Sequence, residues 1–270
     1  MNRPTSSAEA FRQLHRSGLL IIANVWDAGS ARLVESLGAR AVATTSAGVA
    51  WCHGYPDGDV LPPDLLLATI RSIVRVVSLP LSIDLEGGYS HDAEEVADLV
   101  ARAADAGAVG INLEDGSESP ELLCAKIEAI RTRGATHGFD VFVNARTDVF
   151  LRGLAKPETR VTETLARARL YAAAGADGLF VPGLVGADEM KAVAAGTGLP
   201  LNVMARPGLA SAGSLQALGV RRLSAGSGLF EAAFGRVAAL AAGFLDDGDS
   251  APLLETAMPY PRINALMSGG

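Results

Sequence analysis

The residues of this sequence that could carry out chemistry are polar side chains that follow short apolar runs. Three successive runs each end in two polar residues spaced two positions apart, namely Asp84 and Glu86, Asn112 and Glu114, and Asn144 and Arg146. Residues two apart on a strand point to the same face. If these faces meet, three carboxylates converge, and like charges packed so closely are costly unless they are protonated or neutralised by a cation.

This grouping of acids predicts a metal site at Asp84, Glu86 and Glu114. Oxygen ligands without a cluster of Cys or His favour Mg²⁺ or Mn²⁺. Arg146 interrupts an apolar run, and its guanidinium could bind a substrate carboxylate or phosphate through two parallel hydrogen bonds. The alternatives are that the acids are solvated strand ends and that Arg146 forms a salt bridge to one of them.

Two glycine-containing segments could bind an anion through backbone N–H groups. Ser46, Ala47 and Gly48 follow the run at 41–45, and the segment 224–228 follows the last run of the chain. Taken alone, both are weak signals, because any tight turn has this composition. His53 and His91 lie in nearby loops and could transfer protons, although a histidine in a loop is more often only exposed.

The elements that must position these residues alternate along the chain. Ala- and Leu-rich helical stretches follow the apolar runs, which indicates parallel strands joined by crossovers. At Gly38, Gly107, Gly175 and Gly219, a helix is expected to end in a left-handed residue shortly before a strand. We predict strands at about 19–23, 41–45, 81–85, 109–113, 141–146, 178–181, 200–204 and 220–224.

Eight such units in 270 residues predict a single-domain (β/α)8 TIM barrel, with a doubly wound open sheet as the second choice. In such barrels, catalytic groups lie at the carboxyl ends of the strands. We expect residues 1–246 to form the catalytic barrel. The C-terminal extension 247–270 would pack on a neighbouring chain or stay mobile.

Composition excludes several classes of protein. Lys and Arg number 23 against 30 Asp and Glu, and a net charge of −7 argues against a nucleic-acid-binding protein. The sequence shows no apolar run of about 18 residues and no signal peptide, so we expect no membrane partner. Cys52 and Cys124 are the only two cysteines, which predicts neither a disulfide framework nor a thiolate metal site. We expect a cytoplasmic protein.

Four motifs in order resemble those of the isocitrate lyase/phosphoenolpyruvate mutase superfamily. They are TSAGVAW…GYPDG at 45–58, SIDLEGGYS at 82–90, INLEDG at 111–116 and VNARTD at 143–148. Their order at successive strand ends is more specific than any one of them, and the resemblance runs from Asn24 to about Gly228. It implies a Mg²⁺-dependent barrel enzyme that acts on α-oxo or α-hydroxy acids through an enolate-like intermediate.

The resemblance also implies roles for individual residues. Asp84 and Glu86 would be carboxylates of the metal site, with Asp57 and Glu114 assisting largely through metal-bound waters. Ser46, Ala47 and Gly48 would hold the substrate carboxylate, and Arg146 would bind the opposite end of the substrate. The catalytic residues would be Asp57, Glu114 and Arg146.

The sequence departs from the superfamily where its members choose among reactions. Lyases of this superfamily carry a Lys-Lys/Arg-Cys-Gly-His loop after the strand-4 Glu, whereas here Glu114 is followed only by the short segment 115–120. Val181 stands near the position of a Glu in the lyases, and Met204 near that of an Asn. The part of the site that would hold the metal and the oxo acid is therefore intact, and the rest is altered.

These observations favour a Mg²⁺-dependent lyase that cleaves a C–C bond of a small α-oxo or α-hydroxy dicarboxylate. Decarboxylation needs least from the missing loop, and retro-aldol cleavage ranks second. The alternatives are a phosphonate enzyme that makes or breaks a P–C bond, a metabolite-binding member without turnover, and a phosphosugar enzyme that uses the loop around Gly226. Because similar proteins exchange a C-terminal helix, the resemblance also implies a homo-oligomer, either a dimer or a tetramer.

Overall fold

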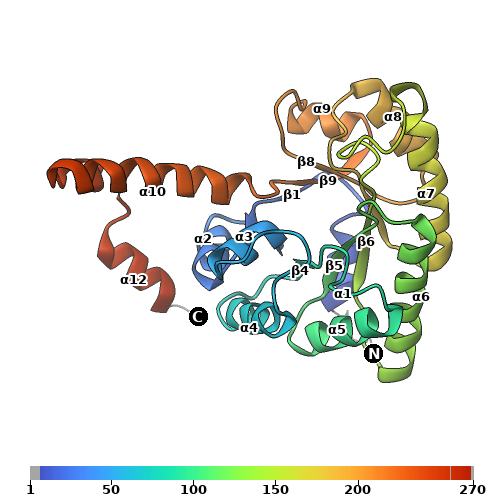
Figure 1. The fold of residues 1–270 in the computed structure, drawn as a ribbon, viewed down its shortest axis with the longest axis horizontal. Coiled ribbons are helices and arrows are strands. Elements are labelled where there is room, and N and C mark those ends of the chain that lie inside the picture. The colour runs from blue at the N-terminus through green and yellow to red at the C-terminus, as the bar shows by residue number, and fades with distance from the viewer. Residues whose placement is uncertain (1–6, 256, 269–270) are drawn as a thin grey trace.

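The computed structural model describes residues 7–255 and 257–268, and its centre is a parallel sheet rolled into a barrel (Figure 1). The strands follow one another around the barrel in the order β1-β9-β8-β7-β6-β5-β4-β3-β2, and every pair is parallel. The strands are β1 (Leu20–Ile22), β2 (Asn24–Val25), β3 (Val42–Thr44), β4 (Leu81–Asp84), β5 (Gly110–Glu114), β6 (Phe142–Arg146), β7 (Gly178–Phe180), β8 (Leu201–Met204) and β9 (Val220–Ser224).

The sheet closes into a barrel through its first strand, which is interrupted at Ala23 between β1 and β2. β1 pairs with β9, β2 pairs with β3, and Ala23 is the only residue between β1 and β2. The two short strands therefore act as one strand that bridges the first and last neighbours. The result is the predicted (β/α)8 arrangement, and the open doubly wound sheet is excluded because both of its edges would have to stay unpaired.

The eight predicted strands all form, with ends that differ by at most two residues from those expected. Gly38, Gly107, Gly175 and Gly219 have φ angles of 88°, 108°, 110° and 94°. Each glycine thus adopts the left-handed conformation that ends a helix, as predicted.

The helices begin with recognisable caps. Asp92 caps α5 by accepting a hydrogen bond from the backbone N–H of Glu94 at 2.8 Å, and Ser119 caps α6 before Pro120. The helices are α1 (Ser7–Gln13), α2 (Ala28–Ser36), α3 (Ser46–Cys52), α4 (Pro63–Val74), α5 (Ala93–Asp105), α6 (Pro120–His137), the 3₁₀ turn η1 (Pro157–Thr159), α7 (Arg160–Ala174), α8 (Ala187–Gly196), α9 (Ala212–Ala217), α10 (Gly228–Asp247), α11 (Ala251–Glu255) and α12 (Tyr260–Ser268).

Two hydrophobic layers hold the barrel together. The larger one lies between the strands and the surrounding helices. The smaller one fills the amino-terminal end of the barrel, where Phe11 of α1 packs edge-on against Phe142 of β6, with ring centroids 5.4 Å apart. Helix α1 thereby closes this end, and the carboxyl ends of the strands remain for the site.

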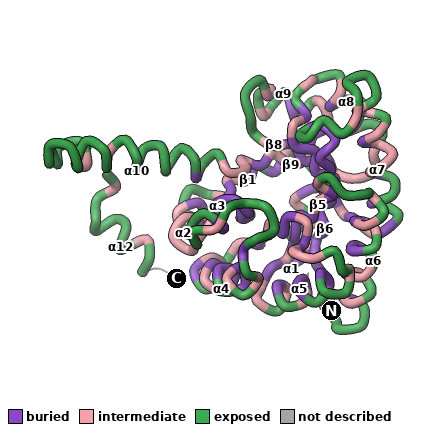
Figure 2. Tube along the Cα trace, viewed as in Figure 1, coloured by how far each residue is buried: buried purple, intermediate pink, exposed green. Residues whose placement is uncertain are grey.

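Helix α10 projects away from the barrel, and α12 returns toward α2 (Figure 1). Both are exposed along almost their whole length (Figure 2). Among the described helices, α10 alone is long and apolar enough to cross a membrane, which differs from the expectation that the sequence contains no such segment. Glu231 and Arg236 interrupt its apolar run, and Phe230, which is 2% exposed, fixes its start against the barrel.

Candidate active site

A belt of buried amides crosses the barrel near the carboxyl ends of the strands. Asn144 donates to the side-chain oxygens of Asn112 at 2.9 Å and Asn202 at 3.0 Å. Asn202 in turn donates to Ser224 Oγ at 3.2 Å, and Asn112 lies 3.5 Å from Asp84 Oδ1. A chain of side-chain contacts from β9, β8, β6 and β5 thus reaches the Asp84 carboxylate at the end of β4.

Asp84 also contacts the segment after β3. Its Oδ2 accepts hydrogen bonds from the hydroxyl of Ser46 at 3.0 Å and from the backbone N–H of Ser46 at 3.3 Å. Partial burial, followed by the charge of Asp84, raises the pKa of Asp57, while a hydrogen bond from Ser46 opposes this shift. Asp57, Ser46 and Asp84 therefore lie together.

The segment expected to be an open loop at 46–48 is the first turn of helix α3. Ser46, Ala47 and Gly48 are all buried there. A Cβ at Gly48 would lie 2.7 Å from Thr45 Cγ2 and 3.1 Å from Trp26 Cβ, so glycine is required by packing and not by its backbone conformation. The N–H groups still lie at a helix N-terminus, where donors without intrahelical partners can bind an anion.

Glu86 lies differently from the prediction. β4 ends at Asp84, and Glu86 has a φ of 52°, so strand alternation does not place the two side chains on one face. Glu86 Oε2 accepts hydrogen bonds from the backbone N–H groups of Gly58, at 2.8 Å, and Asp59, while the Tyr89 hydroxyl donates to Oε1 at 3.1 Å. Burial raises the pKa of Glu86 to about 7.

Asp59 completes a reciprocal link between the same two loops. Its carboxylate accepts from the N–H groups of Gly87 at 3.1 Å and Tyr89 at 2.9 Å. Asp59, Glu86 and Tyr89 are the only described non-glycine residues with positive φ. Backbone strain of this kind gathers at functional sites and is held by surrounding contacts, which here are the carboxylate–backbone hydrogen bonds of Asp59 and Glu86.

Arg146 is held by two acids. Its Nη1 lies 2.6 Å from Glu114 Oε2, while Nε and Nη2 donate to Asp148 at 2.7 and 3.0 Å. The salt bridge considered as an alternative therefore exists, yet three bonds leave two of the five guanidinium N–H donors for a substrate. Burial raises the pKa of Glu114, and the charge of Arg146 opposes this shift.

Sequence reasoning missed two buried carboxylates that support this arginine. Asp148 is 0% exposed and also accepts from Arg152 at 2.8 Å. Asp115, 2% exposed, accepts from the Tyr171 hydroxyl at 2.6 Å and from the backbone N–H of Asp148 at 2.9 Å. Each follows a predicted site residue closely in sequence, so its position within the motifs INLEDG and VNARTD was the available signal.

Among the described residues, no three acids, histidines or cysteines come together as ligands of one metal ion. Of the three predicted metal ligands, Glu86 is turned toward the loop at 57–59 and Glu114 toward Arg146. Asp84 remains as a carboxylate with hydroxyl and amide partners. This donor set fits Mg²⁺, which typically keeps several waters and binds to one or two protein carboxylates.

The remaining candidates take no clear part in this site. Nε2 of His53 lies 3.0 Å from Thr69 Oγ1, and the side chain of His91 is 79% exposed. Burial raises the pKa of the Cys52 and Cys124 thiols, which makes both less reactive. In the loop after β9, the N–H groups of Ala225 and Gly226 already donate to Asn24 Oδ1 at 2.9 and 3.0 Å, which weighs against a phosphate site there.

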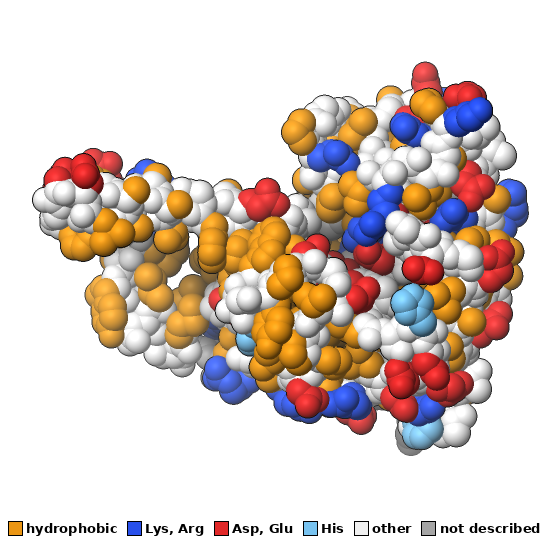
Figure 3. Space-filling model, viewed as in Figure 1, with side chains coloured by type: hydrophobic (Ala, Val, Ile, Leu, Met, Phe, Trp, Pro, Cys, Tyr) orange, Lys and Arg blue, Asp and Glu red, His pale blue; other side chains and the backbone are white. Residues whose placement is uncertain are grey.

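At the open end of the barrel, the site combines several carboxylates with the guanidinium of Arg146. Acidic and basic side chains gather around a hollow in the visible face of the molecule (Figure 3). Asp84 ends β4, Glu86 follows it, and Asp57 lies in the segment between α3 and α4. Arg146 lies on β6 beside Glu114 of β5. The fold and this arrangement define a barrel enzyme of the lyase and mutase class.

Comparison with known proteins agrees with this class. The family model of phosphoenolpyruvate phosphomutase matches residues 11–245, and the chain belongs to this family. A solved structure of a proposed phosphonomutase from Burkholderia cenocepacia is 43% identical, with a TM-score of 0.82 over 87% of this chain and 98% of that one. An uncharacterized protein of Mycobacterium tuberculosis is 36% identical over 96% of both chains.

Relatives with named activities include lyases and a hydrolase. An oxaloacetate decarboxylase from Bradyrhizobium is 32% identical over 66% of this chain and 63% of its own length. A 2-methylisocitrate lyase from Salmonella typhimurium is 33% identical over 65% and 62%. A phosphonopyruvate hydrolase, solved with oxalate and Mg²⁺, is 25% identical with a TM-score of 0.83 over 97% of this chain and 95% of that one.

Proposed function

We propose that this enzyme cleaves a C–C bond of a small α-oxo or α-hydroxy dicarboxylic acid, with decarboxylation of an oxaloacetate-like acid as the leading reaction. The observation that carries the proposal is the contact of Asp84 with both the hydroxyl and the N–H of Ser46, opposite an arginine with two free donors. The similarity to an oxaloacetate decarboxylase and a 2-methylisocitrate lyase supports it.

In this proposal, the chain's own groups bind the two ends of the oxo-acid unit. The N–H groups of Ala47 and Gly48 hold one carboxylate, because the first turn of α3 presents unpaired donors there. The Ser46 hydroxyl, which donates to Asp84 in the free site, turns to the same carboxylate. Arg146 binds the other end through its two remaining N–H groups. Glu114 and Asp148 keep the guanidinium in place, so little ordering remains to be done when the substrate binds.

We propose Mg²⁺ or Mn²⁺ as the cofactor, held by Asp84, with Asp57, Glu86 and Glu114 bonded to its waters. The relative solved with oxalate and Mg²⁺ supports this choice. When bound, the cation would offset the negative charge that develops on the α-oxo group as the bond breaks.

Decarboxylation breaks the C–C bond first, and one proton must then be supplied after CO₂ has left. The electron pair of the broken C–C bond moves toward the α-oxo group, and the carbon that lost CO₂ then takes a proton from water or from Tyr89. The Tyr89 hydroxyl lies 3.1 Å from Glu86 Oε1, which can return a proton to it. This arrangement would replace the cysteine that lyases of the superfamily carry on their longer loop.

The test is a screen of the purified protein with Mg²⁺ and with EDTA. Oxaloacetate, 2-methylisocitrate, phosphonopyruvate and phosphosugars would be compared by thermal melting, and every stabilising compound would be assayed for products by NMR. A ligand at about 100 times its Kd adds about 2.7 kcal/mol of stability. We expect an EDTA-sensitive shift with an oxo acid and release of CO₂. EDTA-sensitive binding without turnover would instead identify a metabolite-binding protein.

A phosphonate enzyme that makes or breaks a P–C bond is the second candidate. The matching family model and the 43% identical relative favour it. Asp57, next to Ser46 and Asp84, would then be the group that accepts or relays the phosphoryl unit. Phosphorus NMR of phosphonopyruvate with the enzyme distinguishes the two, because only this candidate produces a new phosphorus signal.

We further propose that residues 1–246 form the catalytic domain of a cytoplasmic homo-oligomer, either a dimer or a tetramer. The exposed apolar side chains of α10 support this assembly, since Phe234 is 54% and Val237 59% exposed. Apolar surface of this extent on a projecting helix is typical of protein interfaces.

A further inference from the structure

A cavity of about 420 Å³ opens beside the site, between the loops after β4 and β5 and the first turns of α6. Tyr89 and Glu114 line it on the side of the site, and Leu122 and Lys126 of α6 line it on the other. Its volume exceeds that of a three- or four-carbon acid. Only five residues connect β5 to α6, and this short connection leaves the cavity accessible.

Lys126 is the unusual residue of this cavity. It is 5% exposed, and its Nζ donates to Gly87 O at 2.6 Å. Among the described residues, no carboxylate lies within ion-pair distance of it, although buried lysines are normally paired. Two of its three N–H donors remain for a ligand. Burial lowers the pKa of Lys126, as expected for a cation that lacks a bonded acid.

The acids around the cavity are already engaged. Glu114 is paired with Arg146, Asp115 with Arg167 at 2.8 Å, and Asp59 with two backbone N–H groups. Arg152 also lines the wall, but its Nε donates to Asp148 at 2.8 Å, so its charge is already paired. Lys126 is therefore the cation of this wall without a carboxylate partner among the described residues, while Asp59 keeps its charge and the exposed Glu118 lies 3.6 Å from His91.

We propose that this cavity is a specificity subsite that binds a second anionic group of the substrate, with Lys126 as its principal cation. The inference rests on the proposed function, in which Ser46 and Arg146 hold the oxo-acid unit. The substrate class is then an α-oxo acid with a carboxylate at its far end, and Leu122 and Leu123 contact the methylene carbons between. An aliphatic monoacid would leave the Lys126 ammonium without a partner.

The experiment is calorimetric titration of the whole protein with Mg²⁺ and matched pairs of acids. The pairs are 2-oxoglutarate with 2-oxovalerate and 2-oxoadipate with 2-oxohexanoate, and oxalate represents the oxo-acid unit alone. We expect the diacid of at least one pair to bind ten times more tightly than its monoacid. Lys126→Met should reduce this preference below threefold and leave the oxalate Kd within twofold, and Lys126→Arg should restore most of it.

Two further variants keep the test decisive. Lys191 is exposed on α8, so Lys191→Met should change nothing. If Lys126→Met fails to fold, Leu122→Glu places a negative charge on the half-buried cavity wall and should weaken diacid binding alone. Equal binding of diacids and monoacids by the wild type overturns the subsite. Absence of Mg²⁺-dependent oxalate binding overturns the proposed function, and the subsite with it.

Discussion

At the scale of single residues, the site depends on which acids are bonded to backbone and which to arginine. Glu86 and Asp59 tie two loops together through main-chain N–H groups, whereas Glu114 and Asp148 hold Arg146. Asp84 is the acid whose partners are a hydroxyl and an amide. Carboxylates therefore serve three purposes within one site: they link two loops, they hold Arg146, and at Asp84 they face a hydroxyl and an amide.

Glu86 makes stability depend on pH. Its pKa of about 7 in the folded chain lies above the ordinary value of 4.5, so the folded state binds more protons between these values. The contribution of Glu86 to stability in EDTA should then be fully present below pH 4.5 and be lost as pH rises through 7, by on the order of 3 kcal/mol at most. Glu86→Gln should flatten this slope in urea unfolding measured at pH 5 and 7.5. Glu118→Gln, at an exposed position, should retain it.

Arg146 should not tolerate replacement by lysine. Lysine cannot bond Glu114 and both oxygens of Asp148 at once, and bonds between charged groups contribute about 1.5–3 kcal/mol each. Arg146→Lys should weaken Mg²⁺-dependent oxalate binding by at least tenfold in calorimetry. Arg152→Lys changes a half-exposed arginine on the same Asp148 and should cost less than threefold. Similar losses in both variants would contradict a substrate-binding role for Arg146.

At the scale of elements, the junctions between helices and strands place the polar residues at one end of the barrel. Gly107 follows α5 with a φ of 108°, and a Cβ there would lie 2.9 Å from both methyl carbons of Val74. Gly138 ends α6 with a φ of 77° and has open space around it. A comparison of Gly107 with Gly138 therefore separates the cost of a left-handed backbone from the cost of overpacking.

Gly107→Ala should therefore destabilise the protein more than Gly138→Ala. Left-handed strain costs about 1–2 kcal/mol in both, while overpacking adds about 1–3 kcal/mol at Gly107 alone. Urea unfolding of the two variants in parallel measures this difference. Equal losses would show that Val74 moves aside without cost.

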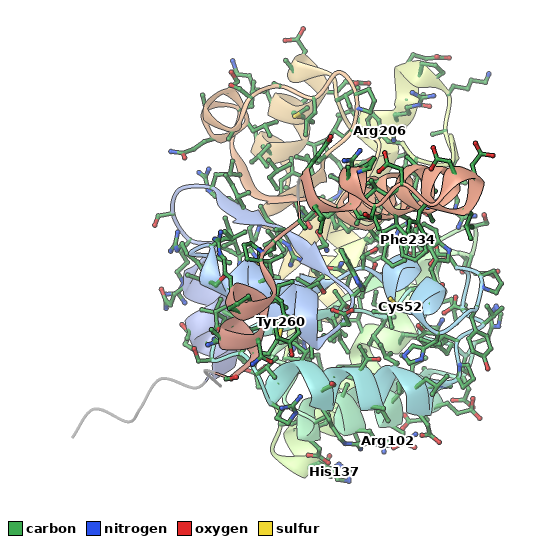
Figure 4. All side chains as sticks on the ribbon, turned by 90° about the vertical axis from the view of Figure 1, so that its left-hand side faces the viewer. Cys52, Arg102, His137, Arg206, Phe234 and Tyr260 are labelled. Atoms are coloured by element: carbon green, nitrogen blue, oxygen red, sulfur yellow. The ribbon has the colours of Figure 1, made fainter. Side chains whose placement is uncertain are left out.

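At the scale of the whole molecule, α10 is the helix that leaves the barrel after its first turn, where Phe230 packs on Trp26 and Trp51. Phe230 at its start stacks on Phe234, with ring centroids 4.1 Å apart, and Phe234 lies on the side of the helix that faces Cys52 at the end of α3 (Figure 4). Farther along, Phe244 and Leu245 are 45% and 84% exposed. This apolar surface is where a second copy would pack.

Size-exclusion chromatography with light scattering should give a mass above the 27.8 kDa of one chain, at about 56 kDa for a dimer or about 111 kDa for a tetramer. Val237→Asp should shift the protein toward the monomer, because burying an unpaired charge in an interface is costly. Leu37→Asp, at a 73% exposed position at the end of α2, is the control and should keep the oligomer. A wild-type monomer would refute the assembly.

The sequence by itself determined the order of strands and helices, because hydrophobic periodicity and glycine caps act locally. It also placed Asp84, Glu114 and Arg146 correctly at strand ends. It could not place Glu86, whose positive φ breaks the alternation, nor show that 46–52 is helical, which depends on packing against Trp26 and Phe230.

Only the tertiary structure decided which charges meet. Glu114 faces Arg146 because strand register sets them side by side, and Lys126 is buried because the loop carbonyl of Gly87 reaches it from 39 positions away. Burial and pairing depend on how distant segments approach one another, and no local pattern encodes that. The acids at the strand ends were therefore readable from sequence, whereas the lysine beside them was not.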